Sequence, residues 1–338
     1  MNCKPVATMS RIVSCIISRM TSRMSSSTNS RISSRMSSSM MGQTTRCTTS
    51  RASTCTGWPA IRHGLLALLG WAAMAACAQS VVEFESLDQR GGSAVMLKAF
   101  WLPAPSPAGP RPAVTLFHGC GGPYDRRGQL SQRLRDYAAL LNGQGMHALV
   151  VDSLSPRGER ELCTQRLGTR AVTQANRRLD ALAALSWLAL RNDVDDRRIG
   201  MMGWSHGGST VLAATNLRHR DVADHAVRPR FAVAFYPGCE AELKRGYEPG
   251  SRLLMLVGDA DDWTPAAPCV GLAQSAAEPK PLIETYAGAY HGFDSTVPVR
   301  LRSDVPGGVN PGQGVHVGGN PQALKLSRER LLRFLAEQ

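Results

Sequence analysis

The sequence predicts an α/β fold, a mainly parallel twisted sheet of about eight strands with helices on both faces. Three observations support this. From residue 81 onward, short apolar segments alternate with helical ones over about 250 residues. The run at 113–118 (AVTLFH) is continuously apolar, which is typical of a strand buried on both faces. The segment 169–191 has an apolar residue at every third or fourth position, as amphipathic helices do.

The elements are expected in the following order. Strands at 81–87 and 94–102 flank a turn at 90–92 (RGG), which predicts an antiparallel pair. After a proline-rich loop come the strand 113–118, the helix 129–143, the strand 146–152, the helix 169–191, the strand 198–204, the helix 206–217 and the strands 231–236, 253–257 and 282–286. A last helix is expected behind Asn320, because proline is favoured in the first turn of a helix. No break in the pattern marks a second domain, so residues 79–338 are expected to form a single domain.

The charge of the chain is concentrated in its N-terminal part. The 338 residues carry a formal net charge of +13, with 39 Lys and Arg against 26 Asp and Glu. Residues 1–82 hold nine of the basic residues and no acidic one, which leaves 30 against 26 in the remainder. Without a basic stripe or a zinc-binding spacing, residues 79–338 are not expected to bind nucleic acid.

The N-terminal part is expected to contribute no folded domain. Residues 1–57 are a low-complexity stretch of Ser, Thr, Arg and Met, either disordered or the product of a translation start assigned too far upstream. Residues 58–78 resemble a secretory signal peptide, because basic residues precede an apolar run at 64–76 and small residues allow cleavage after Ala78. That run is shorter than the roughly 20 residues of a membrane span.

Export to the bacterial periplasm or out of the cell is therefore expected, with two alternatives left open. The residues ending at Cys77 (MAAC) also resemble a lipobox, which would lipidate Cys77 and bring the protein to a membrane. The Arg-rich, Ser-rich and acid-free composition of residues 1–57 also fits an organellar transit peptide, although the apolar run and the cleavage site favour a signal peptide.

Four of the nine cysteines lie in residues 79–338: Cys120, Cys163, Cys239 and Cys269. In an exported chain they are compatible with two disulfides, in one of three connectivities. We expect Cys239 to pair with Cys269, because both follow strands that should end at the same edge of the sheet. The alternative is a set of small buried thiols.

Residues 203–207 (GWSHG) are the first candidate for chemistry. They lie between a predicted strand and a predicted helix, which is the context of a nucleophile elbow. Glycines around the serine permit a sharp strained turn that holds the hydroxyl above the sheet at a helix N-terminus. Ser205 is the predicted nucleophile, and a glycine-rich turn without a catalytic role is the alternative.

A serine nucleophile needs a histidine base and a carboxylate that fixes the tautomer of that base. On an α/β sheet the acid follows the serine in the chain, and the histidine follows the acid. The strand 253–257 ends in an acidic loop. Asp261 is the predicted acid, Asp262 is its main rival, and Asp259 is assigned to the turn. His291, beyond the last strand, is the predicted base.

Backbone N–H groups that stabilise the negative oxygen of a tetrahedral intermediate are expected at two positions. One is His206, directly after the predicted nucleophile, and the other is Cys120 in the loop 118–122 (HGCGG). Cys120 would act through its backbone, and a nucleophilic thiol there is a minor alternative.

The remaining histidine side chains are not expected to bind a metal. His118 and His206 should pack or hydrogen-bond locally. A surface or loop position is expected for His147, His219, His225 and His316. No pair of these residues has a metal-site spacing with cysteines or acids, so no metal is predicted.

Four motifs together resemble the dienelactone hydrolase family of α/β-hydrolases. In chain order they are residues 118–122 (HGCGG), 203–207 (GWSHG), 261–265 (DDWTP) and 290–293 (YHGF), and the likeness covers nearly all of the chain from residue 81. The resemblance implies the α/β-hydrolase fold, no cofactor, and hydrolysis of small esters or lactones in a pocket above the strand ends.

The sequence departs from the founding enzymes of that family in its nucleophile. Those enzymes use a cysteine held by a glutamate from the loop after an early strand, whereas this chain has Ser205 and no acid in the matching loop. A serine hydrolase is therefore implied, and lactone specificity stays open. The segment 302–319 is long for a loop after the base, and we expect it either to fold over the site or to be a disordered surface loop.

The sequence thus predicts an exported serine hydrolase of small carboxylic esters or lactones that acts through Ser205, His291 and Asp261. A small-molecule substrate is the expected partner, and membrane contact is expected only if Cys77 is lipidated. A peptidase on the same fold is the second interpretation. A catalytically silent envelope protein that binds a ligand is the third. The acyl and alcohol groups and the oligomeric state stay open.

Overall fold

A computed structural model describes residues 79–105 and 109–338. The predicted signal segment, the cleavage position at Ala78 and the lipobox cysteine Cys77 lie outside the described residues. Among the helices of these described residues, none has both the length and the apolar character of a membrane span.

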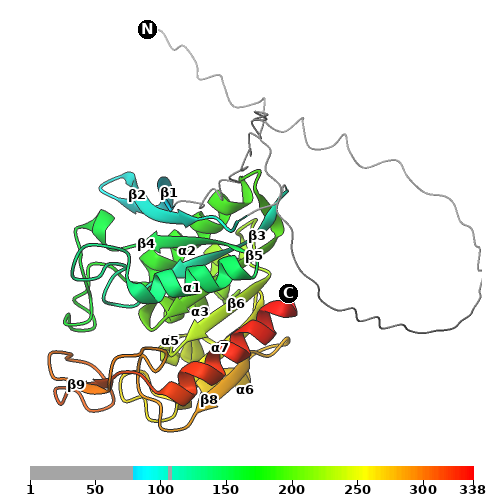
Figure 1. Ribbon diagram of the computed structural model, residues 1–338. Coiled ribbons are helices and arrows are strands. Elements are labelled where there is room, and N and C mark those ends of the chain that lie inside the picture. The colour runs from blue at the N-terminus through cyan, green and yellow to red at the C-terminus, as the bar shows by residue number, and fades with distance from the viewer. Residues whose placement is uncertain (1–78, 106–108) are drawn as a thin grey trace, which may run out of the picture. The chain divides into compact units, whose positions relative to one another are not determined.

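An eight-stranded sheet forms the centre of the fold, in the order β1-β2-β4-β3-β5-β6-β7-β8 (Figure 1). Its strands are β1 (Ser80–Arg90), β2 (Ser93–Leu102), β3 (Arg111–Phe117), β4 (His147–Asp152), β5 (Val194–Trp204), β6 (Phe231–Phe235), β7 (Arg252–Gly258) and β8 (Leu282–Tyr286). β2 is antiparallel to both β1 and β4, and every other neighbouring pair is parallel. The predicted fold class is therefore confirmed.

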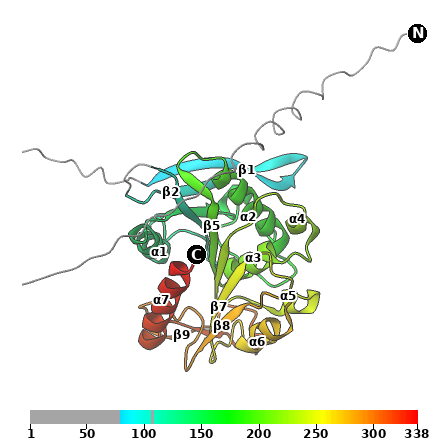
Figure 2. The same ribbon diagram turned by 90° about the vertical axis from the view of Figure 1, so that its right-hand side faces the viewer.

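The helices form a layer on each face of this sheet. They are α1 (Gln132–Gly143), α2 (Gln174–Ala189), α3 (His206–Thr215), α4 (Arg220–Ala223), α5 (Glu240–Arg245), α6 (Ala266–Ser275) and α7 (Pro321–Ala336). α1 and α7 bury side chains in the apolar cluster on one face, and α2, α3 and α6 bury theirs in the cluster on the other. Figure 2 shows the sheet between these two groups of helices.

Burial of the central strands follows from their sequence. Every residue of β4 is buried. Leu149 and Val151 pack into the apolar cluster beneath α2 and α3, whereas Ala148 and Val150 pack into the cluster beneath α1 and α7. Alternate side chains of a strand point to opposite faces, so a continuous apolar run is what a strand covered on both sides requires.

The helix α2 begins later than its apolar pattern suggests. The pattern predicts a start at residue 169, but the first helical residue is Gln174. Thr173 accepts a hydrogen bond from the Asn176 N–H while the Asn176 side chain accepts from the Thr173 N–H, which is a capping box. Residues 153–172 instead form a connection that contains the short 3-10 helix η1 (Ser155–Arg157).

Two histidines differ from expectation because each has partners in the interior. The sequence predicts a surface or loop position for His147, but this residue is buried at the start of β4, where Nδ1 accepts from the Ala104 N–H at 2.9 Å. His219, for which the same was expected, is buried against Glu242, with 3.0 Å between its Nε2 and the carboxylate. A histidine in a polar stretch of sequence is buried when such partners come from elements distant in the chain.

Candidate active site

Ser205 occupies the sharp turn between β5 and α3. Its backbone has φ 54° and ψ −119°, a strained conformation for a residue other than glycine. A Cβ at Gly203 would lie 2.2 Å from the Gly207 carbonyl oxygen, and a Cβ at Gly207 would lie 2.0 Å from the Phe117 carbonyl oxygen. Only glycine fits at either position, so the two glycines of the GWSHG motif let this turn close against the end of β3.

The side chains of Ser205, His291 and Asp261 meet at the carboxyl ends of β5, β7 and β8. His291 Nε2 lies 2.8 Å from Ser205 Oγ, and His291 Nδ1 lies 2.8 Å from Asp261 Oδ2. All three residues are buried, and Ser205 is the most exposed of them at 9%. A carboxylate, an imidazole and a hydroxyl bonded in series can draw a proton away from the hydroxyl.

Asp261 is held in place by the loop that carries it. Its Oδ1 accepts hydrogen bonds from the N–H groups of Trp263 and Thr264, each at 2.9 Å. The Thr264 hydroxyl lies 3.1 Å from Asp261 Oδ2, 3.1 Å from His291 Nδ1 and 3.0 Å from the Tyr236 carbonyl oxygen. Thr264 is a site residue that the sequence pattern does not single out, although it lies within the DDWTP motif.

The neighbouring acid Asp262 fastens the long segment after His291. It accepts from the His316 N–H at 2.8 Å, and its side chain lies 2.7 Å from His316 Nδ1. Its carbonyl oxygen accepts from the Val309 N–H at 2.8 Å. The segment includes a small hairpin of β9 (Arg300–Arg302) and β10 (Val315–Val317). Of the two expected alternatives for residues 302–319, the structure has the one in which they fold against the site.

Asp259 has a local role. Its side chain accepts a hydrogen bond from the Gly288 N–H at 2.7 Å, which joins the loop after β7 to the loop after β8. Of the three carboxylates in the acidic loop, Asp261 alone contacts His291.

The backbone N–H groups of Cys120 and His206 are free to receive a ligand. Within the described residues neither has a hydrogen-bond partner. His206 is the first residue of α3, where N–H groups have no partner inside the helix. A Cβ at Gly119 would lie 3.6 Å from Ser205 Cβ, so the loop 118–122 runs directly past Ser205.

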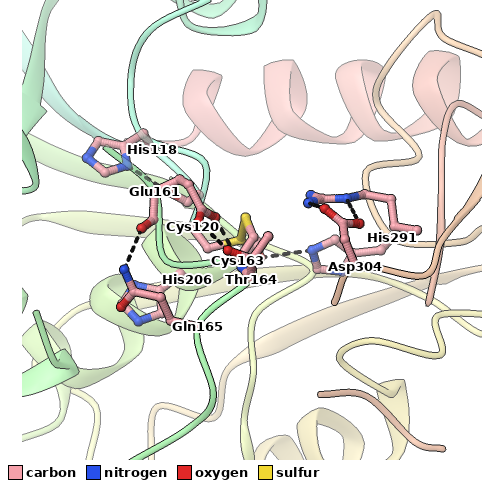
Figure 3. Close-up of a disulfide and its surroundings, with 12 residues drawn as sticks. His118, Cys120, Glu161, Cys163, Thr164, Gln165, His206, His291 and Asp304 are labelled. Atoms are coloured by element: carbon pink, nitrogen blue, oxygen red, sulfur yellow. Dashed lines mark hydrogen bonds and ion pairs between the residues drawn. A yellow bond between two sulfur atoms is a disulfide. The ribbon is translucent and has the colours of Figure 1, made fainter. Parts of the chain in front are cut away.

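Two disulfides hold the loops near Ser205. Cys239 is bonded to Cys269, which is the expected pair, and Cys120 is bonded to Cys163. Figure 3 shows the Cys120–Cys163 disulfide with His206 and His291 in its surroundings. The alternative of free buried thiols is therefore wrong, and so is that of Cys120 as a nucleophile. The Cys120 carbonyl oxygen also accepts from the Leu162 N–H at 2.7 Å, so the loop 118–122 is tied to residues 153–172 twice.

A cavity of about 540 Å³ opens beside Ser205, Cys120 and His206. Its walls come from Arg170 in the connection before α2, from Gln174 at the start of α2, from residues 238–242, from the loop after β7 (Trp263, Thr264) and from residues 307–309. A volume of this size suits a small-molecule ligand. Within residues 79–105 and 109–338, no group of three His, Cys, Asp or Glu side chains is placed to bind a metal ion.

A buried carboxylate behind Ser205 and His291 is a further part of the site. Asp294 accepts hydrogen bonds from the hydroxyl groups of Tyr137 and Tyr236, at 3.0 and 2.7 Å, and from the Trp204 indole N–H at 3.0 Å. Burial, together with the nearby Asp294 charge, raises the pKa of Tyr137 well above its usual value, so Tyr137 stays a donor. Asp294 follows His291 by three residues, and nothing local in the sequence signals its role.

Comparison of the sequence with known proteins gives a matching family and a curated relative. A family model described as the Dienelactone hydrolase family matches residues 99–338. The protein named "Putative hydrolase YtaP" of Bacillus subtilis (strain 168) is 29% identical over 141 residues, 38% of this chain. The match spans only 46% of that protein.

Solved structures agree in fold. The dienelactone hydrolase-like promiscuous phosphotriesterase P91 from metagenomic libraries matches with a TM-score of 0.53 at 19% identity, over 77% of this chain and 98% of that one. Esterase 2 of Thermogutta terrifontis, phosphorylated by paraoxon, matches with a TM-score of 0.50 at 18% identity, over 77% of this chain and 95% of that one. Because the family model covers most of the chain, the protein belongs to the dienelactone hydrolase family.

Proposed function

We propose that this protein is an exported serine hydrolase that cleaves small carboxylic esters or lactones through an acyl-enzyme. The observation that carries the proposal is the pair of 2.8 Å contacts that His291 makes with Ser205 and Asp261. They lie beside a cavity of about 540 Å³ that is also lined by Cys120 and His206, the two residues with free N–H groups. Membership of a hydrolase family supports the same class of chemistry.

In the first half of the reaction Ser205 Oγ attacks the ester carbonyl carbon. Its proton passes to His291 Nε2, and Asp261 stabilises the imidazolium that forms. The carbonyl oxygen takes the negative charge and accepts hydrogen bonds from the N–H groups of Cys120 and His206. When the tetrahedral intermediate collapses, the bond to the leaving oxygen breaks, and the alcohol departs with the proton from His291.

The second half repeats these steps with water as the nucleophile. His291, neutral again, accepts a proton from the water that attacks the acyl carbon. A second tetrahedral intermediate then releases Ser205, which recovers its proton from His291, and the free acid leaves. No cofactor enters either half, and a lactone would give one hydroxy acid in place of two products.

Two observations support the proposal that the protein is exported. Residues 79–105 and 109–338 contain two disulfides, Cys120–Cys163 and Cys239–Cys269, and such bonds persist in oxidising compartments. The segment 58–78 has the composition of a signal peptide. We therefore propose that the working form begins near Gln79 and acts in the periplasm or outside the cell.

The proposal is tested with the chain from Gln79, produced under oxidising conditions. Wild type should hydrolyse short p-nitrophenyl esters and react covalently with a fluorophosphonate. Ser205→Ala should lose both properties. Ser209→Ala, which removes the other serine hydroxyl that lines the cavity, should still be labelled. Labelling and turnover by Ser205→Ala would refute the assignment, and a wild type with neither property would favour the silent binding protein.

A further inference from the structure

Arg177 is a buried cation without a carboxylate in contact. It lies in the first turn of α2, and its side chain is fully buried. None of the ion pairs formed within the described residues includes it. Burial lowers the pKa of Arg177 to about 10, so it remains charged at neutral pH. Because burying a charge without direct pairing is costly, such a residue calls for a specific role.

The guanidinium joins the two segments that carry the free N–H groups beside Ser205. Nη2 donates to the His118 carbonyl oxygen at 2.8 Å, in the loop that leads to Cys120. Nη1 lies 2.7 Å from His206 Nδ1, at the start of α3. The loop after β3 and the first turn of α3 are thus linked through one side chain, which fixes their relative position.

The contact with His206 also determines its tautomer. An arginine has only donors, so His206 Nδ1 must accept, and the ring must be neutral with its proton on Nε2. Burial lowers the pKa of His206 well below its usual value, and the charges of Arg177 and Arg170 and the nearby His118 lower it further. Arg177, Arg170 and His118 therefore all favour the neutral form of His206.

The opposite side of the imidazole is available to a ligand. His206 lines the cavity beside Ser205. Its only ring contact within the described residues is the one between Nδ1 and Arg177, so Nε2 has no partner there. A neutral ring with an Nε2–H therefore supplies a third hydrogen-bond donor in this region, in addition to the two backbone N–H groups.

We propose that Arg177 is a positioning residue, which aligns the Cys120 and His206 N–H groups and holds His206 as a neutral Nε2–H donor to an oxygen of the bound substrate. The inference deepens the proposed function and rests on it. It adds a specificity element, because esters or lactones with an acceptor oxygen besides the scissile carbonyl would gain a hydrogen bond from His206.

Removal of Arg177 should leave the fold intact. The nearby carboxylates keep other partners, since Asp180 binds Arg157 at 2.7 Å and Asp152 accepts from the Leu154 N–H at 3.0 Å. Arg177→Met keeps the length of the side chain and removes its donors. Arg178→Met is the matched control, because Arg178 is the next residue of α2 and binds Asp221 at 2.9 Å, away from the cavity.

The experiment compares both variants with wild type by ester kinetics, circular dichroism and nitrogen-15 NMR of the histidine rings. Arg177→Met should lower kcat by about 10- to 100-fold with little change in KM, because misplacement of the reacting groups by about 1 Å has effects of this size. His206 should be the neutral Nε2–H form in wild type from about pH 5 to 8. In Arg177→Met it should show Nδ1–H signal or protonation at the acidic end. Arg178→Met should match wild type.

Two results would overturn the inference. One is a folded Arg177→Met with wild-type kcat, and the other is an unchanged His206 tautomer in that variant. If circular dichroism shows that Arg177→Met does not fold, Arg177→Lys takes its place, because an ammonium lacks the rigid planar fork that aims two separate nitrogens at the His118 carbonyl oxygen and His206 Nδ1. A wild-type kcat and an unchanged His206 tautomer in Arg177→Lys would also overturn the inference. If wild type hydrolyses no ester, the proposed function fails, while the NMR comparison still tests the hold on His206.

Discussion

The buried carboxylate of Asp294 accepts a hydrogen bond from the indole N–H of Trp204, the residue that precedes Ser205, at 3.0 Å. The same carboxylate accepts from the Tyr236 hydroxyl at 2.7 Å, and the Tyr236 ring packs on His291 with 4.8 Å between centroids. The Asp294 carboxylate therefore contacts both the residue that precedes Ser205 and the tyrosine that packs on His291.

Asp294→Asn should destabilise the protein. Arg133 Nε lies 3.3 Å from Asp294, and it would lose its countercharge. Breaking a buried ion pair costs about 3 to 5 kcal/mol, and the 36% exposure of the Arg133 side chain reduces this, so we expect about 2 kcal/mol in the free energy of unfolding. Urea unfolding measures it. The control Asp304→Asn removes an exposed partner of Arg302 and should cost about 0.5 kcal/mol or less. Equal stabilities of the two variants would contradict this account.

The two disulfides should differ in their effect on activity more than on stability. They close loops of 43 and 30 residues, so replacing either pair by serines should cost about 4 kcal/mol of unfolding free energy. The pair Cys120–Cys163 fixes a candidate oxyanion N–H, and its loss should lower kcat about tenfold more than the loss of Cys239–Cys269. Thermal melts and ester kinetics on both double variants test this. A larger loss of kcat on replacement of Cys239 and Cys269 would argue against the Cys120 N–H as an oxyanion donor.

Stability should fall as the pH falls below about 6.5. Burial, and then the nearby Arg177, lower the pKa of His118 to about 3. Between these values the unfolded chain binds a proton at this residue and the folded protein does not, so unfolding is favoured as the pH drops. His118 alone should contribute about 1 kcal/mol for each pH unit. Urea titrations between about pH 4 and 7 measure the slope. His118→Gln should reduce it, and an unchanged slope would show that His118 takes up its proton in the folded protein.

Asp261→Asn and Asp262→Asn should separate two roles of adjacent carboxylates. The first variant leaves His291 without the partner that fixes its tautomer, and kcat should fall by about 10³- to 10⁴-fold. The second loosens the contact with His316, which fastens the segment whose residues 307–309 line the cavity, so KM should change while kcat stays within about threefold. Steady-state measurement of kcat and KM for both variants on one ester distinguishes the two roles. A greater kcat loss in Asp262→Asn would reverse the assignment.

Much of the fold and of the candidate site could be predicted from local sequence. The order of the strands along the chain can be predicted from the apolar runs. Ser205 can be recognised as a nucleophile because glycines lie around it, as a sharp turn requires. Asp261 and His291 could be located because each follows a strand, and the ends of parallel strands meet at one edge. Such patterns are short-range, so they can be recognised in a single sequence.

Other parts of the site depend on partners that are distant in the chain. Asp294 lies 157 residues from Tyr137, and Arg177 lies 59 from His118, so no local pattern links either pair. The sequence predicts Asp261 as the acid but keeps Asp262 as a rival for the same reason, since the choice depends on where His291 and His316 lie in space.

The central claim is that Ser205 carries the acyl group. Rapid acid quenching of the reaction with a p-nitrophenyl ester, followed by peptide mass spectrometry, tests it directly. The account predicts one added acyl group, assigned by fragmentation to Ser205 and absent from Ser205→Ala. An acyl group on any other residue, or turnover at the wild-type rate by Ser205→Ala, would contradict it.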